Sequence, residues 1–81
     1  MKVAVKFFAR ARDLAGIGNL ELDLPETSRL GDVKQLLAEK VPALSPVMSN
    51  LLFAVGTEYA DDRTPLPANA DIACFPPVSG G

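Results

Sequence analysis

Apolar and polar residues alternate in two short segments near the amino terminus. Within residues 2–8, one set of alternate positions is wholly apolar (Val3, Val5 and Phe7), whereas the other set contains both lysines. This alternation is typical of a β-strand that buries one face. In residues 20–24, leucines alternate with acidic residues, and a proline follows them. Because consecutive strands usually pair, we expect the two segments to form a hairpin. Between them, residues 9–15 are rich in alanine and arginine and predict a short helical turn or a compact loop.

The middle of the chain has the periodicity of a helix instead. Asp32 near the start of this segment and Lys40 near its end both suit the helix dipole, and Pro42 ends it. We expect Thr27 or Ser28 to cap its amino terminus. The apolar residues that would form one stripe along the helix are Leu30, Val33, Leu36, Leu37 and Val41.

The second half of the chain contains three further segments that fit strands, at residues 51–55, 58–60 and 72–75. Residues 42–50 and 61–69 contain prolines and polar residues, which predicts connectors. The order strand, strand, helix, strand, short strand, strand predicts an α+β domain with two layers.

One face of this predicted sheet has no second helix to cover it. We expect Phe8, Phe53 and Phe75 to contribute to that face. Because an uncovered apolar face on a small domain is a physical reason to expect docking, we expect a surface for a partner protein there.

Composition limits the classes of function. The 81 residues suffice for one domain, and the net charge of −2 comes with scattered basic residues, which argues against nucleic-acid binding. No apolar run approaches the roughly 20 residues that span a bilayer, so we expect no membrane partner. The single cysteine, Cys74, fits a reducing compartment, and we expect a cytoplasmic protein. On the last strand we expect Cys74 to pack in the core.

Two groups of charged residues are candidate chemical sites. Arg10 and Arg12 fit either contact with a partner or phosphate, or simple solvation. Asp61 and Asp62 are adjacent, but adjacency in a polar loop does not create an acid and base pair, so we expect solvated carboxylates.

The carboxyl terminus carries the strongest functional signal. Pro76 and Pro77 favour an extended backbone that holds the following residues away from the domain. Gly80 and Gly81 have no Cβ, so they can enter a channel too narrow for other residues. This pattern indicates that the terminal carboxylate of Gly81 is the reactive group. We therefore divide the chain into a domain of residues 1–75 and an extended Gly-Gly tail of residues 76–81.

Two segments together resemble a known family, the small subunits of molybdopterin synthase. They are Phe7-Phe8-Ala9-Arg10-Ala11-Arg12-Asp13-Leu14-Ala15-Gly16 and Phe75-Pro76-Pro77-Val78-Ser79-Gly80-Gly81. The resemblance implies a two-layer β-grasp (ubiquitin-like) fold, with a mixed sheet of four to five strands packed on one main helix. It also implies a sulfur carrier in molybdenum cofactor biosynthesis.

The resemblance further assigns roles to the tail. Gly81 would be adenylated and converted to a thiocarboxylate, and Gly80, Ser79, Val78, Pro77 and Pro76 would lie in the channel of a partner. Phe75, Phe53 and Phe8 would contact that partner, the large subunit, in a heterotetramer of two small and two large subunits. The small subunit would supply no catalytic group and bind no cofactor or metal. ATP would be used by a separate adenylyltransferase, the activating enzyme.

Three other functions stay open from the sequence. One is sulfur delivery to another pathway such as thiamine synthesis, whose carriers usually lack the Pro-Pro-Val segment. Another is a ubiquitin-like modifier joined to lysines through Gly81. The third is a non-catalytic interaction domain with an inert tail, whose function would survive deletion of Gly80 and Gly81.

Overall fold

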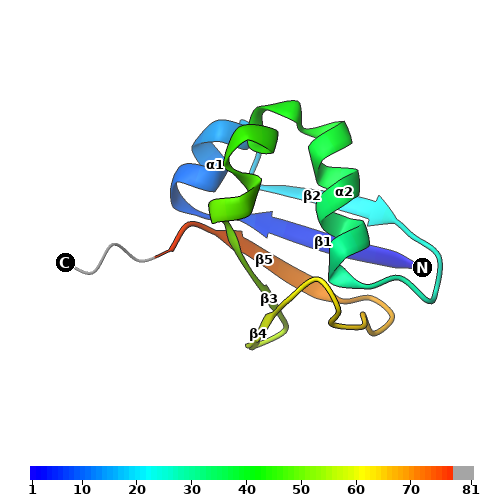
Figure 1. Ribbon diagram of the computed structural model, residues 1–81. Coiled ribbons are helices and arrows are strands. Elements are labelled where there is room, and N and C mark those ends of the chain that lie inside the picture. Colours follow the sequence, from blue (N-terminus) through cyan, green and yellow to red (C-terminus); the bar gives the residue numbers. More distant parts are fainter. Residues whose placement is uncertain (78–81) are drawn as a thin grey trace.

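The computed structural model describes residues 1–77, and Figure 1 shows the arrangement of their elements. Two α-helices and a 3₁₀ helix accompany five strands. In chain order these are β1 (Lys2–Phe7), α1 (Ala9–Ala15), β2 (Asn19–Asp23), α2 (Leu30–Lys40), η1 (Pro42–Asn50), β3 (Leu52–Val55), β4 (Glu58–Ala60) and β5 (Asp71–Phe75).

The five strands form one mixed sheet in the order β2-β1-β5-β3-β4. The expected hairpin is present, because β1 and β2 pair antiparallel. The last strand lies in the centre, parallel to β1 and antiparallel to β3. With α2 packed across one face, this topology confirms the predicted α+β, β-grasp fold.

The core lies between the sheet and the three helices, which Figure 1 shows on the same side of the sheet. The central strands contribute Val5, Phe53 and Ile72, each at most 2% exposed. On α2, the predicted stripe supplies Leu30, Val33, Leu37 and Val41 to the core, while Leu36 is only partly buried. The other face of the sheet carries no helix in the described chain, as predicted.

The start of α2 differs from the prediction. Its N-cap is Arg29, and neither Thr27 nor Ser28 caps it. The Arg29 backbone N–H donates to the Asp32 carboxylate at 2.8 Å, so the third helical residue stabilises the cap. Ser28 is buried instead, and its carbonyl accepts a hydrogen bond from the Leu66 N–H.

The loop between β4 and β5 completes the amino-terminal end of α2. The carbonyls of Thr64 and Asp62 accept hydrogen bonds from the first two helical N–H groups, of Leu30 and Gly31, at 2.9 and 3.0 Å. These N–H groups have no partner within the helix, so the loop satisfies them. A side chain at Gly31 would meet the Asp62 carbonyl at 3.2 Å, so the absence of a Cβ permits this close approach.

Two connectors carry more structure than the sequence predicted. Residues 42–50 form η1, with a proline at its start and a second proline inside it. Residues 9–15, predicted as a helical turn or compact loop, form α1, which ends at Gly16 in the left-handed conformation with φ 75°. Residues 61–69 form no helix or strand, as predicted.

Candidate functional site

The carboxyl-terminal end of β5 is held on both sides. Cys74 lies opposite Phe7 of β1, and Phe75 lies opposite Leu52 of β3. The Phe8 N–H extends the ladder by donating to the Cys74 carbonyl at 3.0 Å. Because proline has no N–H to donate, the β5 ladder stops at Phe75. The sheet therefore fixes the point at which the tail begins.

The predicted tail residues fall partly within the described structure. Pro76 is partly buried and Pro77 is exposed, and both line a hollow together with residues of α1 and η1. Val78, Ser79, Gly80 and Gly81 lie outside the described residues. Their assigned roles, and those of the two prolines in a channel, stay predictions.

Pro76 and Pro77 are here called the tail base. Beside it, four side chains form an apolar area on the uncovered face of the sheet, here called the open-face patch. Strand alternation turns them away from the core, because their neighbours Phe7, Phe53 and Cys74 are buried. The Tyr59 and Phe75 rings lie 5.9 Å apart between centroids, and Tyr59 is 75% exposed. The members of the open-face patch are Phe8, Leu52, Tyr59 and Phe75.

Phe8 and Phe75 thus lie where the sequence placed them, although contact with a partner stays a prediction. Leu52 and Tyr59 were missed. Tyr59 carried a usable signal, since aromatic residues are enriched in strands and dominate the binding energy of many interfaces. Leu52 carried none, because every residue from Leu51 to Val55 is apolar.

Phe53 corrects the expectation that all three phenylalanines contribute to the uncovered face. It is 2% exposed, and its register partners are Ala60 and Cys74. Its ring faces the helical layer, where the Lys34 ammonium lies 5.3 Å from the ring centroid. A side chain in this position stabilises the fold and offers no surface to a partner.

Cys74 lies in the core, which confirms the interpretation of this residue as a small hydrophobic group. Burial raises the pKa of its thiol to about 11. The reactive thiolate is therefore scarce at neutral pH, and Cys74 is a poor nucleophile.

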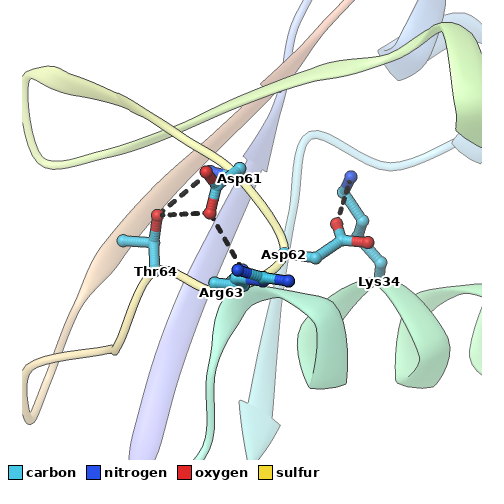
Figure 2. A network of polar contacts seen from close by, with 5 residues as sticks. All are labelled: Lys34, Asp61, Asp62, Arg63 and Thr64. Carbon is cyan, nitrogen blue, oxygen red and sulfur yellow. Dashed lines mark hydrogen bonds and ion pairs between the residues drawn. The ribbon is translucent and has the colours of Figure 1, made fainter.

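The adjacent carboxylates Asp61 and Asp62 have separate structural partners, as Figure 2 shows. Asp61 accepts hydrogen bonds from the Arg63 N–H at 2.9 Å and the Thr64 hydroxyl at 3.3 Å. Asp62 forms an ion pair of 2.6 Å with Lys34 of α2. Both carboxylates are exposed, so their arrangement supports a turn rather than an acid and base pair.

Other kinds of site have no support within residues 1–77. No three His, Cys, Asp or Glu residues gather there in a way that could hold a metal ion. None of the described helices combines the length and apolar character needed to cross a membrane.

Comparison with known proteins shows which family the chain resembles. The model of the ThiS family matches residues 5–81. The molybdopterin synthase sulfur carrier subunit of Arabidopsis thaliana is 35% identical over 81 residues, which is all of this chain and 84% of that protein. Similar sulfur carrier subunits from Chlamydomonas reinhardtii and Caenorhabditis elegans are 31% and 34% identical over this whole chain.

Solved structures with the same fold include SAMP1 from Haloferax volcanii, a small archaeal modifier protein. The superposition has a TM-score of 0.88 and 28% sequence identity, and it covers 100% of this chain and 100% of SAMP1. A second is the complex of subunits 1 and 2 of the molybdopterin-converting factor from Helicobacter pylori, with a TM-score of 0.75, 27% identity and 100% coverage of both chains.

Proposed function

Because the chain belongs to the ThiS family, we propose that it is the sulfur carrier subunit of a molybdopterin synthase. The observation that carries this proposal is the similarity over the whole chain to sulfur carrier subunits of that enzyme. The structure supports it by holding β5 rigidly in the sheet up to the residue before the tail.

The chemistry would take place on the carboxyl group of Gly81. A carboxylate is a poor electrophile, so activation has to give it a better leaving group. In the proposed sequence, the Gly81 carboxylate attacks the α-phosphate of ATP on the activating enzyme, and pyrophosphate leaves. Hydrosulfide from the sulfur donor then attacks the acyl carbon and AMP leaves, and loss of the proton from sulfur yields the thiocarboxylate. The carrier domain itself binds no cofactor in this scheme.

The thiocarboxylate would then act inside the large subunit. Its negative charge lies largely on a polarisable sulfur, which makes it a nucleophile at neutral pH. Four residues follow Pro77, and fully extended they reach at most about 14 Å. The site where sulfur enters the cyclic pterin precursor would therefore lie within that distance of Pro77. The product, molybdopterin, carries a dithiolene, a group with two sulfur atoms. Two deliveries of sulfur by the carrier would therefore be needed for each molecule of molybdopterin.

The open-face patch supports docking of a large subunit. It presents apolar area next to the tail base, and three of its four members (Phe8, Tyr59 and Phe75, beside Leu52) are aromatic. Aromatic residues dominate the binding energy of many interfaces. The relative from Helicobacter pylori was solved as a complex of subunits 1 and 2, which supports a large-subunit partner. We extend this to a heterotetramer with two copies of each subunit.

We also place this function in the cytoplasm. Cys74 is the only cysteine of the chain and is a free thiol in the core. Proteins without structural disulfides are typical of reducing compartments.

Intact mass spectrometry tests the proposal. The chain is incubated with its activating enzyme, ATP and a sulfur donor, and we expect one oxygen atom to be replaced by sulfur at Gly81. A variant with one alanine appended after Gly81 is the matched control, because it keeps the domain and moves the reactive carboxylate. An unchanged mass for the natural chain, under conditions that convert an established carrier, would refute the function.

The similarity to SAMP1 favours one second candidate, a protein modifier. In that case Gly81 would form isopeptide bonds with lysines of other proteins. An affinity-tagged chain expressed in its own cells would then give a ladder of conjugates that survive denaturation. A sulfur carrier predicts none of these conjugates, and predicts loss of molybdenum enzyme activity when Gly80 and Gly81 are deleted.

A further inference from the structure

A small hollow of about 190 Å³ lies between α1 and η1, immediately beside the tail base. Ala11 and Leu14 of α1 and Val47 of η1 supply apolar lining. This α1–η1 hollow is smaller than the roughly 300 Å³ at which small-molecule pockets begin. Its size therefore suits a single protruding side chain.

The hollow is continuous with the path of the tail. Pro76 and Pro77 form part of its lining, and Leu51, just before β3, forms another part. A partner that encloses the residues after Pro77 must bring the mouth of its channel against Pro77. Because Pro77 also lines the α1–η1 hollow, the rim of such a channel would lie over the hollow.

The rim of the hollow carries one charge. Arg10 and Asn50 are its polar lining residues, and both are exposed. Arg10 forms no ion pair with any residue in the described part of the chain. A guanidinium presents its donors in a planar fork that matches a carboxylate, and arginine is enriched among residues that dominate binding energy.

We propose that the α1–η1 hollow is a second docking site for the large subunit, separate from the open-face patch. It receives an apolar side chain from the rim of the tail channel, and a neighbouring carboxylate of the large subunit pairs with Arg10. This inference rests on the proposed function. It assigns to α1 and η1 a role in seating the channel around the tail.

Arg10→Glu tests the charge, with Arg12→Glu as the matched control. Both arginines are exposed on α1, but Arg12 lies against Gly18 and does not line the hollow. We expect Arg10→Glu to weaken binding of the purified large subunit at least tenfold by calorimetry, and Arg12→Glu to stay within twofold of the natural chain. The affinity of the natural chain for the large subunit should fall as salt is added. Arg10→Glu should remove most of this salt dependence.

Asn50→Trp tests the hollow independently of charge. Asn50 is exposed at the end of η1, so the indole can fill the hollow without entering the core. We expect at least tenfold weaker binding, with a melting temperature close to that of the natural chain. If Arg10→Glu and Asn50→Trp both bind the large subunit within twofold of the natural chain, the inference is overturned. It is also overturned if Arg10→Glu weakens binding to the activating enzyme but not to the large subunit.

The proposed function fails in a different way from this inference. If the natural chain neither gains sulfur at Gly81 nor binds the large subunit, the carrier function itself is refuted and the docking site falls with it. If the natural chain does both and the two variants bind normally, only the docking site is refuted.

Discussion

Replacement of Phe53 by leucine separates a core residue from an interface residue. Phe53 is 2% exposed in the core, with Lys34 over its ring. Truncation of a buried phenylalanine to alanine costs about 3–5 kcal/mol, and leucine keeps about half of the carbon atoms beyond Cβ, so the lost packing costs about 2 kcal/mol. Loss of the cation–π contact adds about 0.5–1 kcal/mol. We expect Phe53→Leu to lower the free energy of unfolding by about 2–3 kcal/mol.

That loss is large for a domain of this size. A single core in such a small protein supplies only about 3–5 kcal/mol, so the urea midpoint should fall by about 40% or more. At about 4–8 °C for each kcal/mol, the melting temperature should drop by about 10–20 °C. Far-UV circular dichroism is the suitable probe, because the chain has no tryptophan and one tyrosine.

The matched control is Tyr59→Leu, on the neighbouring strand but 75% exposed. It should change the free energy of unfolding by less than about 1 kcal/mol, while weakening the binding of the large subunit. At a temperature where both variants are folded, Phe53→Leu should bind as the natural chain does. An unchanged urea midpoint together with weak binding for Phe53→Leu would place this ring at an interface and refute its assignment to the core.

Three further predictions concern the rest of the domain. Gly16→Ala should lower stability by about 1 kcal/mol in thermal unfolding, because φ is +75° there and a Cβ meets no atom within 4 Å, so only backbone strain acts. Asp61→Ala should cost about 1 kcal/mol in the same assay, through loss of the hydrogen bonds from Arg63 and Thr64; an unchanged midpoint would show that the turn holds without them. Cys74 should react with iodoacetamide only as fast as the domain opens. The pKa of the Cys74 thiol in the folded chain, about 11, exceeds its ordinary value of 9.0, so the unfolded chain loses the thiol proton first. The free energy of unfolding should therefore fall as pH rises from 9 to 11, and Cys74→Ala should reduce this pH dependence.

The sequence predicted elements best where the apolar pattern was regular. The stripe from Leu30 to Val41 located α2, and alternation located β1 and β2. The facing of β3 could not be predicted, because Leu51 to Val55 is apolar throughout. Only its pairing with β5 shows that Phe53 lies inward and Leu52 outward.

The remaining differences arise from contacts between distant segments. Ser28 and Thr27 are good capping residues, but the loop after β4 satisfies the first N–H groups of α2 with its own carbonyls. Pro46 suggested an irregular connector, although the short 3₁₀ repeat of η1 accommodates it. The α1–η1 hollow combines residues of α1, η1 and the tail base, so no local pattern indicated it.

The central position of β5 has a consequence for how the protein is made. Of the five strands, β5 comes last in the chain, and it joins two hairpins, β1–β2 on one side and β3–β4 on the other, which have no direct ladder between them. A nascent chain that lacks residues 71–75 therefore cannot assemble the complete sheet, and folding of the sheet waits for this strand. The segment that closes the structure immediately precedes Pro76. Only a chain with a complete sheet holds Pro76 at a defined place, so an unfinished copy would give the proposed activating enzyme no ordered surface to bind.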